Sequence, residues 1–105
     1  MAWLILIVAG LFETGWAVGL KASNGFTRPW PSVATVLAMA VSLYLLGVSL
    51  RTLPLGTAYT VWTGVGAVGA VALGVVLFGE PADPRRLACV GLIVAGIVGL
   101  KLVTP

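Results

Sequence analysis

The sequence predicts an all-α integral membrane protein with four transmembrane helices per chain. Of its 105 residues, 60% are hydrophobic and only 9% are charged, and the mean hydropathy is +1.14. A soluble domain would carry roughly a quarter charged residues to cover its surface. A bilayer core of about 30 Å needs about 20 apolar helical residues per crossing. Four crossings use nearly the whole chain, so residues 1–105 are expected to form a single transmembrane domain.

Long apolar runs separated by proline, glycine and charged residues give the expected spans. All six prolines lie outside these runs, as expected because proline breaks a helix interior. The runs do not alternate apolar and polar residues, which argues against the strands of a membrane barrel. The expected spans cover residues of about 2–20, 32–50, 56–78 and 87–103.

The charged residues and the single cysteine exclude several classes of function. The net charge of +3 comes from basic residues at or near the ends of apolar runs, a placement typical of anchoring at the membrane interface and not of nucleic-acid binding. One cysteine, Cys89, and no histidine make a metal site unexpected. We interpret Cys89 as a small apolar filler. There is no cofactor motif and no nucleophile–base pair, so we do not expect an enzyme.

Glu13 is the acid that stands out, because it lies deep within the first expected span and the other acids do not lie in spans. A charge at mid-membrane costs about 2.5–3.5 kcal/mol on the insertion scale, so such an acid suggests a functional site. A carboxyl group in hydrocarbon favours its neutral form, whereas a neighbouring cation favours the carboxylate. Glu13 can therefore hold either a proton or a cation, although a protonated carboxyl group with a purely structural role is the alternative.

Polar and aromatic residues in the spans are candidates for the surroundings of Glu13. Trp16 follows Glu13 at i+3 on an adjoining part of the same helical face. Ser42 is a lone hydroxyl near the middle of the second span, and Tyr59 and Trp62 begin a polar-aromatic stripe on the third. The aromatic N–H and O–H donors need partners in hydrocarbon and could orient a carboxylate, which is acceptor-only. Placement in an interfacial aromatic belt is the alternative for these aromatic residues, and it is the interpretation we adopt for Trp3 and Trp30.

Small residues in the third and fourth spans suggest bending or close packing. Gly64 and Gly66 lie in mid-helix, where each glycine costs about 1 kcal/mol relative to alanine. They form either a hinge or a close contact. Gly91, Ala95 and Gly99 recur at i, i+4 and i+8, a stripe that lets two membrane helices approach closely. This stripe predicts packing between two copies of the chain.

The distribution of basic residues permits a dimer of two oppositely oriented copies. With an even number of spans, Arg51 and Lys101 lie on the side of the termini, and the other four basic residues lie opposite. This is a weak bias for orienting a membrane protein, so the chain can insert in both directions. Transporters usually bind at the midplane between two related halves. A chain without a visible internal repeat could supply both halves as two oppositely oriented copies.

Three segments resemble the small multidrug resistance family over the full length of the chain. They are WAVGLKASNGFTR at residues 16–28, LPLGTAYTVWTGVGA at 53–67 and GLIVAGIVGLKL at 91–102. Trp16 and Thr63 are similar to the guanidinium-exporting branch, because the drug-exporting branch typically has a small residue and a serine there. The resemblance implies an antiparallel, dual-topology homodimer in a bacterial inner membrane that exports guanidinium in exchange for protons. It further implies that Glu13 binds substrate and proton, with Trp16, Ser42, Tyr59 and Trp62 lining the site.

The chemistry of guanidinium agrees with this expectation, and two alternatives stay open. Guanidinium is planar, permanently charged and rich in N–H donors that suit carboxylates. A quaternary ammonium ion has no donors and favours an aromatic cage. An exporter of lipophilic quaternary ammonium cations is the first alternative. A membrane subunit without transport activity is the second, but such a subunit needs no acid at mid-membrane.

Overall fold

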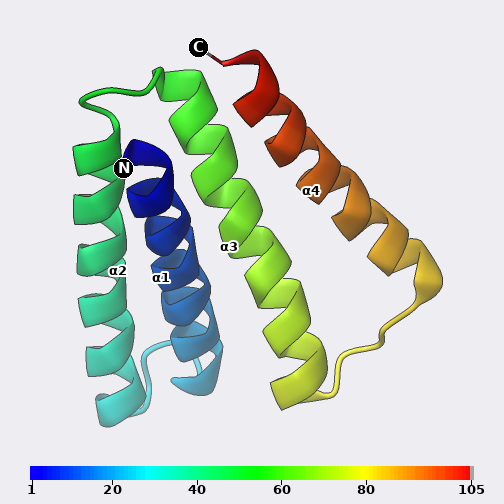
Figure 1. Cartoon of the computed structure of the whole chain (residues 1–105). Coiled ribbons are helices and arrows are strands. Elements are labelled where there is room, and N and C mark those ends of the chain that lie inside the picture. The colour runs from blue at the N-terminus through cyan, green and yellow to red at the C-terminus, as the bar shows by residue number, and fades with distance from the viewer. Residues whose placement is uncertain (105) are drawn as a thin grey trace.

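The computed structural model describes residues 1–104 and contains four α-helices in that part of the chain. They are α1 (Ala2–Ala22), α2 (Pro29–Ser49), α3 (Leu55–Phe78) and α4 (Pro84–Val103). All four are long and apolar enough to cross a membrane, which confirms the expected all-helical fold. They run up and down, so that the two ends of the described chain lie at the same end of the bundle (Figure 1).

The helices begin closer to the prolines than the sequence pattern suggested. All six prolines lie outside the expected apolar runs, but Pro29, Pro31 and Pro84 lie in the first turns of α2 and α4, so these helices begin before the runs do. Proline is tolerated there because the first backbone N–H groups of a helix have no intrahelical acceptor. Asp83 caps α4 by accepting a hydrogen bond from the Arg85 backbone N–H at 2.8 Å.

Two tight turns lie at the opposite end of the bundle from the termini. After α1, the Ser23 hydroxyl donates to the Leu20 carbonyl and accepts from the Phe26 backbone N–H. After α3, Gly79 adopts a left-handed conformation with φ of 66°, and its N–H donates to the Gly74 carbonyl. Glycine suits this C-terminal cap because it has no Cβ to clash. These turns bring the end of α1 close to the α3–α4 loop.

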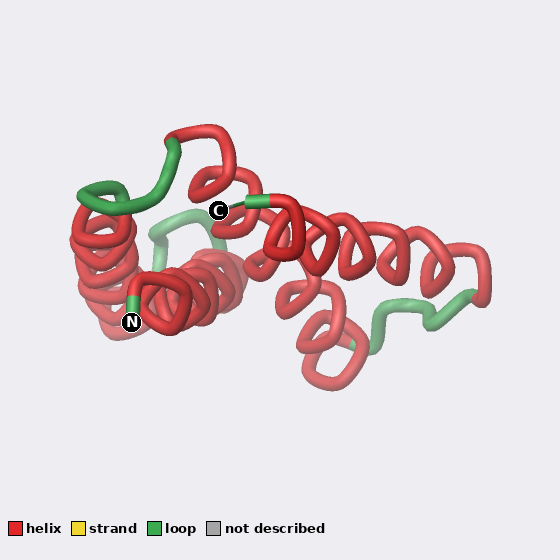
Figure 2. Tube along the Cα trace, turned by 45° about the horizontal axis from the view of Figure 1, so that its top comes forward, coloured by secondary structure: helices red, strands yellow, loops and turns green. Residues whose placement is uncertain are grey.

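The helices pack unevenly. Helix α1 lies between α2 and α3. Helix α4 packs mainly on α3 and stands apart from α2 (Figure 2), and it reaches α1 through Lys101, whose Nζ lies 4.9 Å from the centroid of the Trp3 ring. The buried apolar core lies in the half of the bundle nearer the termini, and α4 contributes none of its described residues to it. The members of the core are Leu6, Ala9, Leu46, Ala58, Val61 and Trp62.

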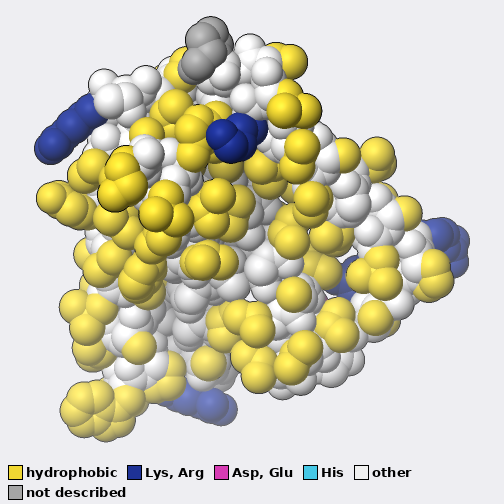
Figure 3. Space-filling model, viewed as in Figure 1, with side chains coloured by type: hydrophobic (Ala, Val, Ile, Leu, Met, Phe, Trp, Pro, Cys, Tyr) yellow, Lys and Arg dark blue, Asp and Glu magenta, His cyan; other side chains and the backbone are white. Residues whose placement is uncertain are grey.

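The outer surface of the bundle is apolar. Hydrophobic side chains cover most of the face seen in Figure 3, and basic side chains appear near the ends of the helices. Large side chains such as Leu43, Val76 and Leu92 are exposed along the helices. A soluble monomer rarely exposes so large an apolar surface, and helices that face lipid do so as a rule. The chain is therefore a multi-pass membrane protein.

Candidate functional site

Glu13 lies on α1 with its carboxyl group packed against Gly66 of α3. A Cβ added to Gly66 would lie 2.6 Å from both the Cδ and the Oε2 atoms of Glu13, so glycine is the residue that leaves room for this carboxyl group. The Oε2 atom is buried and has no hydrogen-bond partner within residues 1–104. Helices α1 and α3 thus hold a carboxyl oxygen away from solvent with its acceptor sites unused.

Thr14 links α1 and α3 by a hydrogen bond at the same interface. This residue was not singled out by the sequence analysis. Its hydroxyl group lies 3.1 Å from the carbonyl oxygen of Gly66 and 3.3 Å from that of Gly10. It therefore ties the backbone of α3 to α1 at the residue that packs on Glu13. The sequence offered one sign of this role, a hydroxyl group directly after Glu13. A helical threonine commonly donates to the carbonyl four residues earlier, however, and this pattern does not predict a second acceptor on another helix.

Ser42 and Trp62 form a hydrogen-bonded link across three helices. The Trp62 indole N–H donates to the Ser42 hydroxyl at 2.9 Å, and that hydroxyl donates to the Ala9 carbonyl at 2.7 Å. Ser42 is fully buried and Trp62 nearly so. The expectation that the Trp62 donor orients the Glu13 carboxylate is wrong in this structure, because the N–H is already paired with Ser42. This link instead fixes α2 and α3 against α1, one turn from Glu13.

Tyr59 lies beside Trp62 but opens toward a different space. The two ring centroids are 5.8 Å apart with planes tilted by 47°, and Tyr59 is 54% exposed. Tyr59, Thr63 and Gly64 line an open cavity of about 560 Å³ between α3 and α4. The Thr63 hydroxyl donates to the Tyr59 carbonyl oxygen. Tyr59 therefore presents its ring on the side of α3 that faces α4.

Trp16 carries a second unpaired polar group. Its indole Nε1 is buried and has no hydrogen-bond partner within residues 1–104. The expected hydrogen bond from Trp16 to Glu13 is not formed in this structure. The two buried, unpaired side-chain atoms that the described chain contains are thus an acceptor on Glu13 and a donor on Trp16, both on α1. Because leaving a buried polar group unpaired is costly, these two atoms mark this part of α1 as the candidate site.

The glycines of α3 are in close contacts. A Cβ on Gly64 would lie 2.8 Å from the Cδ1 atom of Ile97 on α4, so Gly64 permits the approach of α4 as Gly66 permits that of Glu13. Helix α3 is continuous through both positions.

The small-residue stripe on α4 is uncovered in the single chain. Gly91 and Ala95 are exposed, and a Cβ on Gly91 or Gly99 would meet no atom within 4 Å. Cys89 on the same helix is also exposed, so it fills no space inside the chain, contrary to its interpretation as a filler. These residues leave α4 with an apolar surface that no other described helix contacts.

Comparison with known proteins identifies the family. Residues 1–93 match the family model for the Small Multidrug Resistance protein. The chain belongs to the small multidrug resistance family. It is 59% identical over 104 residues to the "Guanidinium exporter" of Citrobacter freundii, covering 99% of both chains. It is 61% identical to the "Guanidinium exporter" of Escherichia coli strain K12, again over 99% of both chains.

Membership of the small multidrug resistance family agrees with the expectation drawn from the three sequence segments. The relatives are named as exporters, and the four membrane-spanning helices suit a transporter. The sites that the resemblance assigned to Glu13, Trp16, Ser42, Tyr59 and Trp62 lie on α1, α2 and α3. No residue of α4 is among them.

Proposed function

We propose that this protein exports guanidinium ion, and small guanidinyl compounds, across the bacterial inner membrane in exchange for protons. The single observation that carries the proposal is the Glu13 carboxyl group, which packs on Gly66 and has a buried oxygen without a hydrogen-bond partner within residues 1–104. The relatives named "Guanidinium exporter", about 60% identical over nearly the whole chain, supply the substrate.

The exchange follows from the two ligands that one carboxylate can hold. Glu13 releases a proton when a cation binds and takes up a proton when the cation leaves, because the neutral acid is favoured in an apolar site. Guanidinium presents a planar fork of N–H donors, which matches the two oxygens of a carboxylate. The unpaired Oε2 of Glu13 is an acceptor for such a donor. No cofactor or metal ion is needed for this exchange.

Trp16, Ser42, Tyr59 and Trp62 line the proposed site in different ways. The Trp62–Ser42 link holds the α2 and α3 walls in place, and Trp16 limits the volume beside Glu13. Its unpaired indole N–H is a donor for a carboxylate that becomes ionised when the cation enters. Tyr59 offers its partly exposed ring to a cation that approaches along α3.

The transporting unit in this proposal is an antiparallel homodimer with dual topology. Alternating access needs two related halves around a midplane site, and the described chain supplies one. The uncovered stripe of Gly91, Ala95 and Gly99 on α4 provides the packing surface between the copies. Gly64 and Gly66 in the middle of α3 pack closely on Ile97 and Glu13, and in this proposal they are also the hinge at which the helix bends during transport.

Transport by the purified protein in proteoliposomes tests the function. Guanidinium uptake driven by an outward proton gradient is expected for the native protein and is expected to vanish for Glu13→Gln, because the amide cannot exchange a proton for a cation. Glu13→Asp keeps the ionisable group and is the matched control, for which we expect slower but measurable exchange. Guanidinium uptake by Glu13→Gln at the native rate would overturn the mechanism. Transport of quaternary ammonium ions without guanidinium would instead support the drug-exporting alternative.

A further inference from the structure

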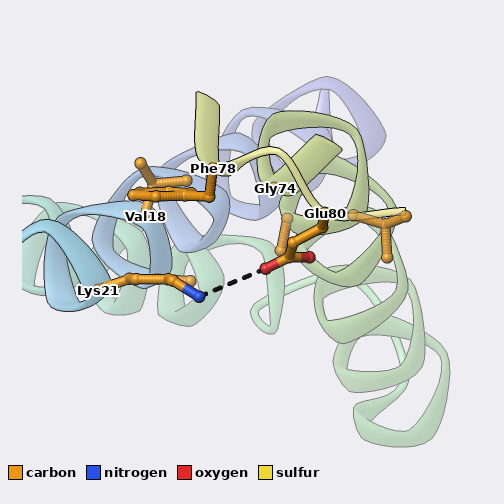
Figure 4. A pocket seen from close by; sticks show the side chains of 8 residues that line it. Val18, Lys21, Gly74, Phe78 and Glu80 are labelled. Carbon is orange, nitrogen blue, oxygen red and sulfur yellow. Dashed lines mark hydrogen bonds and ion pairs between the residues drawn. The ribbon is translucent and has the colours of Figure 1, made fainter. Parts of the chain in front are cut away.

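An ion pair between Lys21 and Glu80 lies at the end of the α1–α3 interface, where α1 and α3 both end. The Glu80 carboxylate in the α3–α4 loop lies 3.5 Å from the Lys21 Nζ at the end of α1, as the dashed line in Figure 4 shows. The same Nζ lies 5.3 Å from the centroid of the Phe78 ring. A carboxylate and an aromatic face are the two groups that proteins use to bind organic cations.

Contacts with Gly74 and Arg86 fix the position of the Glu80 side chain. A Cβ on Gly74 would lie 2.5 Å from Oε1 of Glu80, so the absence of a side chain at Gly74 lets the carboxylate lie against α3. The Glu80 backbone N–H donates to the Gly74 carbonyl at 3.2 Å. The Arg86 guanidinium lies 3.7 Å from the other edge of the carboxylate, at Oε1. Glu80 thus already binds one guanidinium group, that of the chain itself.

Glu80 and Lys21 lie at one end of a cavity that leads toward Glu13. The cavity has a volume of about 220 Å³ and lies between α1 and α3, with Ala17 and Ala70 at its inner end. Ala17 follows Glu13 by four residues, and Ala70 follows Gly66 by four. On an α-helix this spacing is about one turn, or about 6 Å along the axis. The inner end of the cavity therefore lies one turn from the contact of Glu13 with Gly66.

We propose that Glu80 is an outer binding site for the guanidinium ion, which it receives in place of Lys21 and Arg86 before the ion moves along the cavity to Glu13. Guanidinium pairs with a carboxylate through two parallel N–H bonds and stacks on aromatic faces, whereas the lysine ammonium is a point charge. The side chains of Lys21 and Glu80 are 59% and 34% exposed, so an ion in solution reaches this pair. The inference rests on the proposed function and assigns Glu80 a role that Glu13 does not perform.

Two variants that shift the half-saturating guanidinium concentration in opposite directions distinguish a binding site from a structural ion pair. Glu80→Gln removes the carboxylate and is expected to raise the half-saturating guanidinium concentration about three- to fivefold, in line with an exposed charge pair, with little change in the maximal rate. Lys21→Gln leaves the carboxylate but removes its competitor, and is expected to lower that concentration. If the ion pair only holds α1 to the loop, both substitutions break it and the two shifts have the same sign.

A control variant and a replacement variant complete the test of the outer site. Asp83→Asn alters another acid of the same loop while retaining a side chain that caps α4, and is expected to leave the guanidinium dependence unchanged. Arg86→Gln also frees Glu80 and is expected to act as Lys21→Gln does, so it replaces that variant if Lys21→Gln does not yield folded protein. The difference between native protein and Glu80→Gln is expected to shrink at high ionic strength.

Each outcome has one meaning. Native protein that transports no guanidinium contradicts the proposed function before the outer site is tested. Native protein that transports guanidinium, with no shift in Glu80→Gln or with shifts of equal sign in the two variants, overturns the outer site alone.

Discussion

The Glu13 carboxyl group occupies the space that a side chain on Gly66 would need. A Cβ at Gly66 would come within 2.6 Å of the Cδ and Oε2 atoms of Glu13, and Thr14 secures this contact through its hydrogen bond to the Gly66 carbonyl. The proposed site therefore depends on a glycine of α3 as directly as on the acid of α1.

Gly66→Ala is expected to reduce guanidinium transport at least about tenfold, because the added methyl group overpacks a filled interface and displaces the carboxyl group. Uptake in proteoliposomes measures the effect, with circular dichroism and gel filtration as checks of folding. Gly47→Ala on α2 is the matched control, since a Cβ there meets no atom within 4 Å. Native transport by Gly66→Ala would show that the carboxyl group does not need its present position.

The four helices could be predicted from the sequence, and Glu13 could be singled out as the candidate site residue, because both inferences depend on the cost of placing charge and backbone in hydrocarbon. That cost applies residue by residue and needs no knowledge of neighbours. Helices α2 and α4 begin before the expected apolar runs, at Pro29 and Pro84, because a proline in the first turn of a helix loses no hydrogen bond.

The partners of the polar groups depend on how the helices pack and were not predictable in the same way. Trp62 has a donor that suits a carboxylate as well as a hydroxyl, and tertiary packing places it on Ser42. Thr14 and Glu80 are ordinary residues in the sequence, a helical threonine and a loop acid. Their contacts with Gly66 and Gly74 become visible once α3 is packed against α1 and the α3–α4 loop.

The Trp62–Ser42 hydrogen bond is expected to stabilise the fold independently of substrate. Ser42→Ala leaves the buried Trp62 N–H without its acceptor, and Trp62→Phe removes the donor. A double-mutant cycle on reversible unfolding in detergent should give a coupling free energy of roughly 0.6–1.7 kcal/mol, the range for hydrogen bonds between membrane helices. A coupling free energy near zero would mean that the two side chains act separately.

Trp16 is expected to set the size of the accepted cation. Trp16→Gly enlarges the space beside Glu13 and removes a donor to a charged group, so we expect about tenfold weaker guanidinium binding together with new transport of quaternary ammonium ions. Trp16→Phe keeps most of the volume but has no N–H, so it should weaken guanidinium binding without admitting the larger ions. Competition by both cations under matched proton gradients measures the two effects. Equal loss for both cations in Trp16→Gly would assign Trp16 a structural role alone.

The stripe on α4 predicts where two copies of the chain meet. Ala95 is the centre of the stripe formed with Gly91 and Gly99, and in an antiparallel pair the two helices cross near it. Cys89 precedes Ala95 by six residues, which is about 9 Å along the helix, so the two copies of Cys89 would lie about 18 Å apart along the axis. In a parallel pair they would lie at the same height.

Oxidative cross-linking in membranes therefore tests the antiparallel arrangement, which cross-linking through Cys89 would contradict. A disulfide needs Cα atoms about 4.4–6.8 Å apart, so the native protein is expected not to form a dimer linked through Cys89. Ala95→Cys combined with Cys89→Ala places the thiol at the crossing point, and we expect that protein to cross-link in an antiparallel pair. Cys89→Ala alone is the control for cross-linking that does not involve cysteine. Efficient cross-linking through the native Cys89 would contradict the antiparallel arrangement, because thiols separated along the axis by about 18 Å cannot meet without a large displacement of the helices.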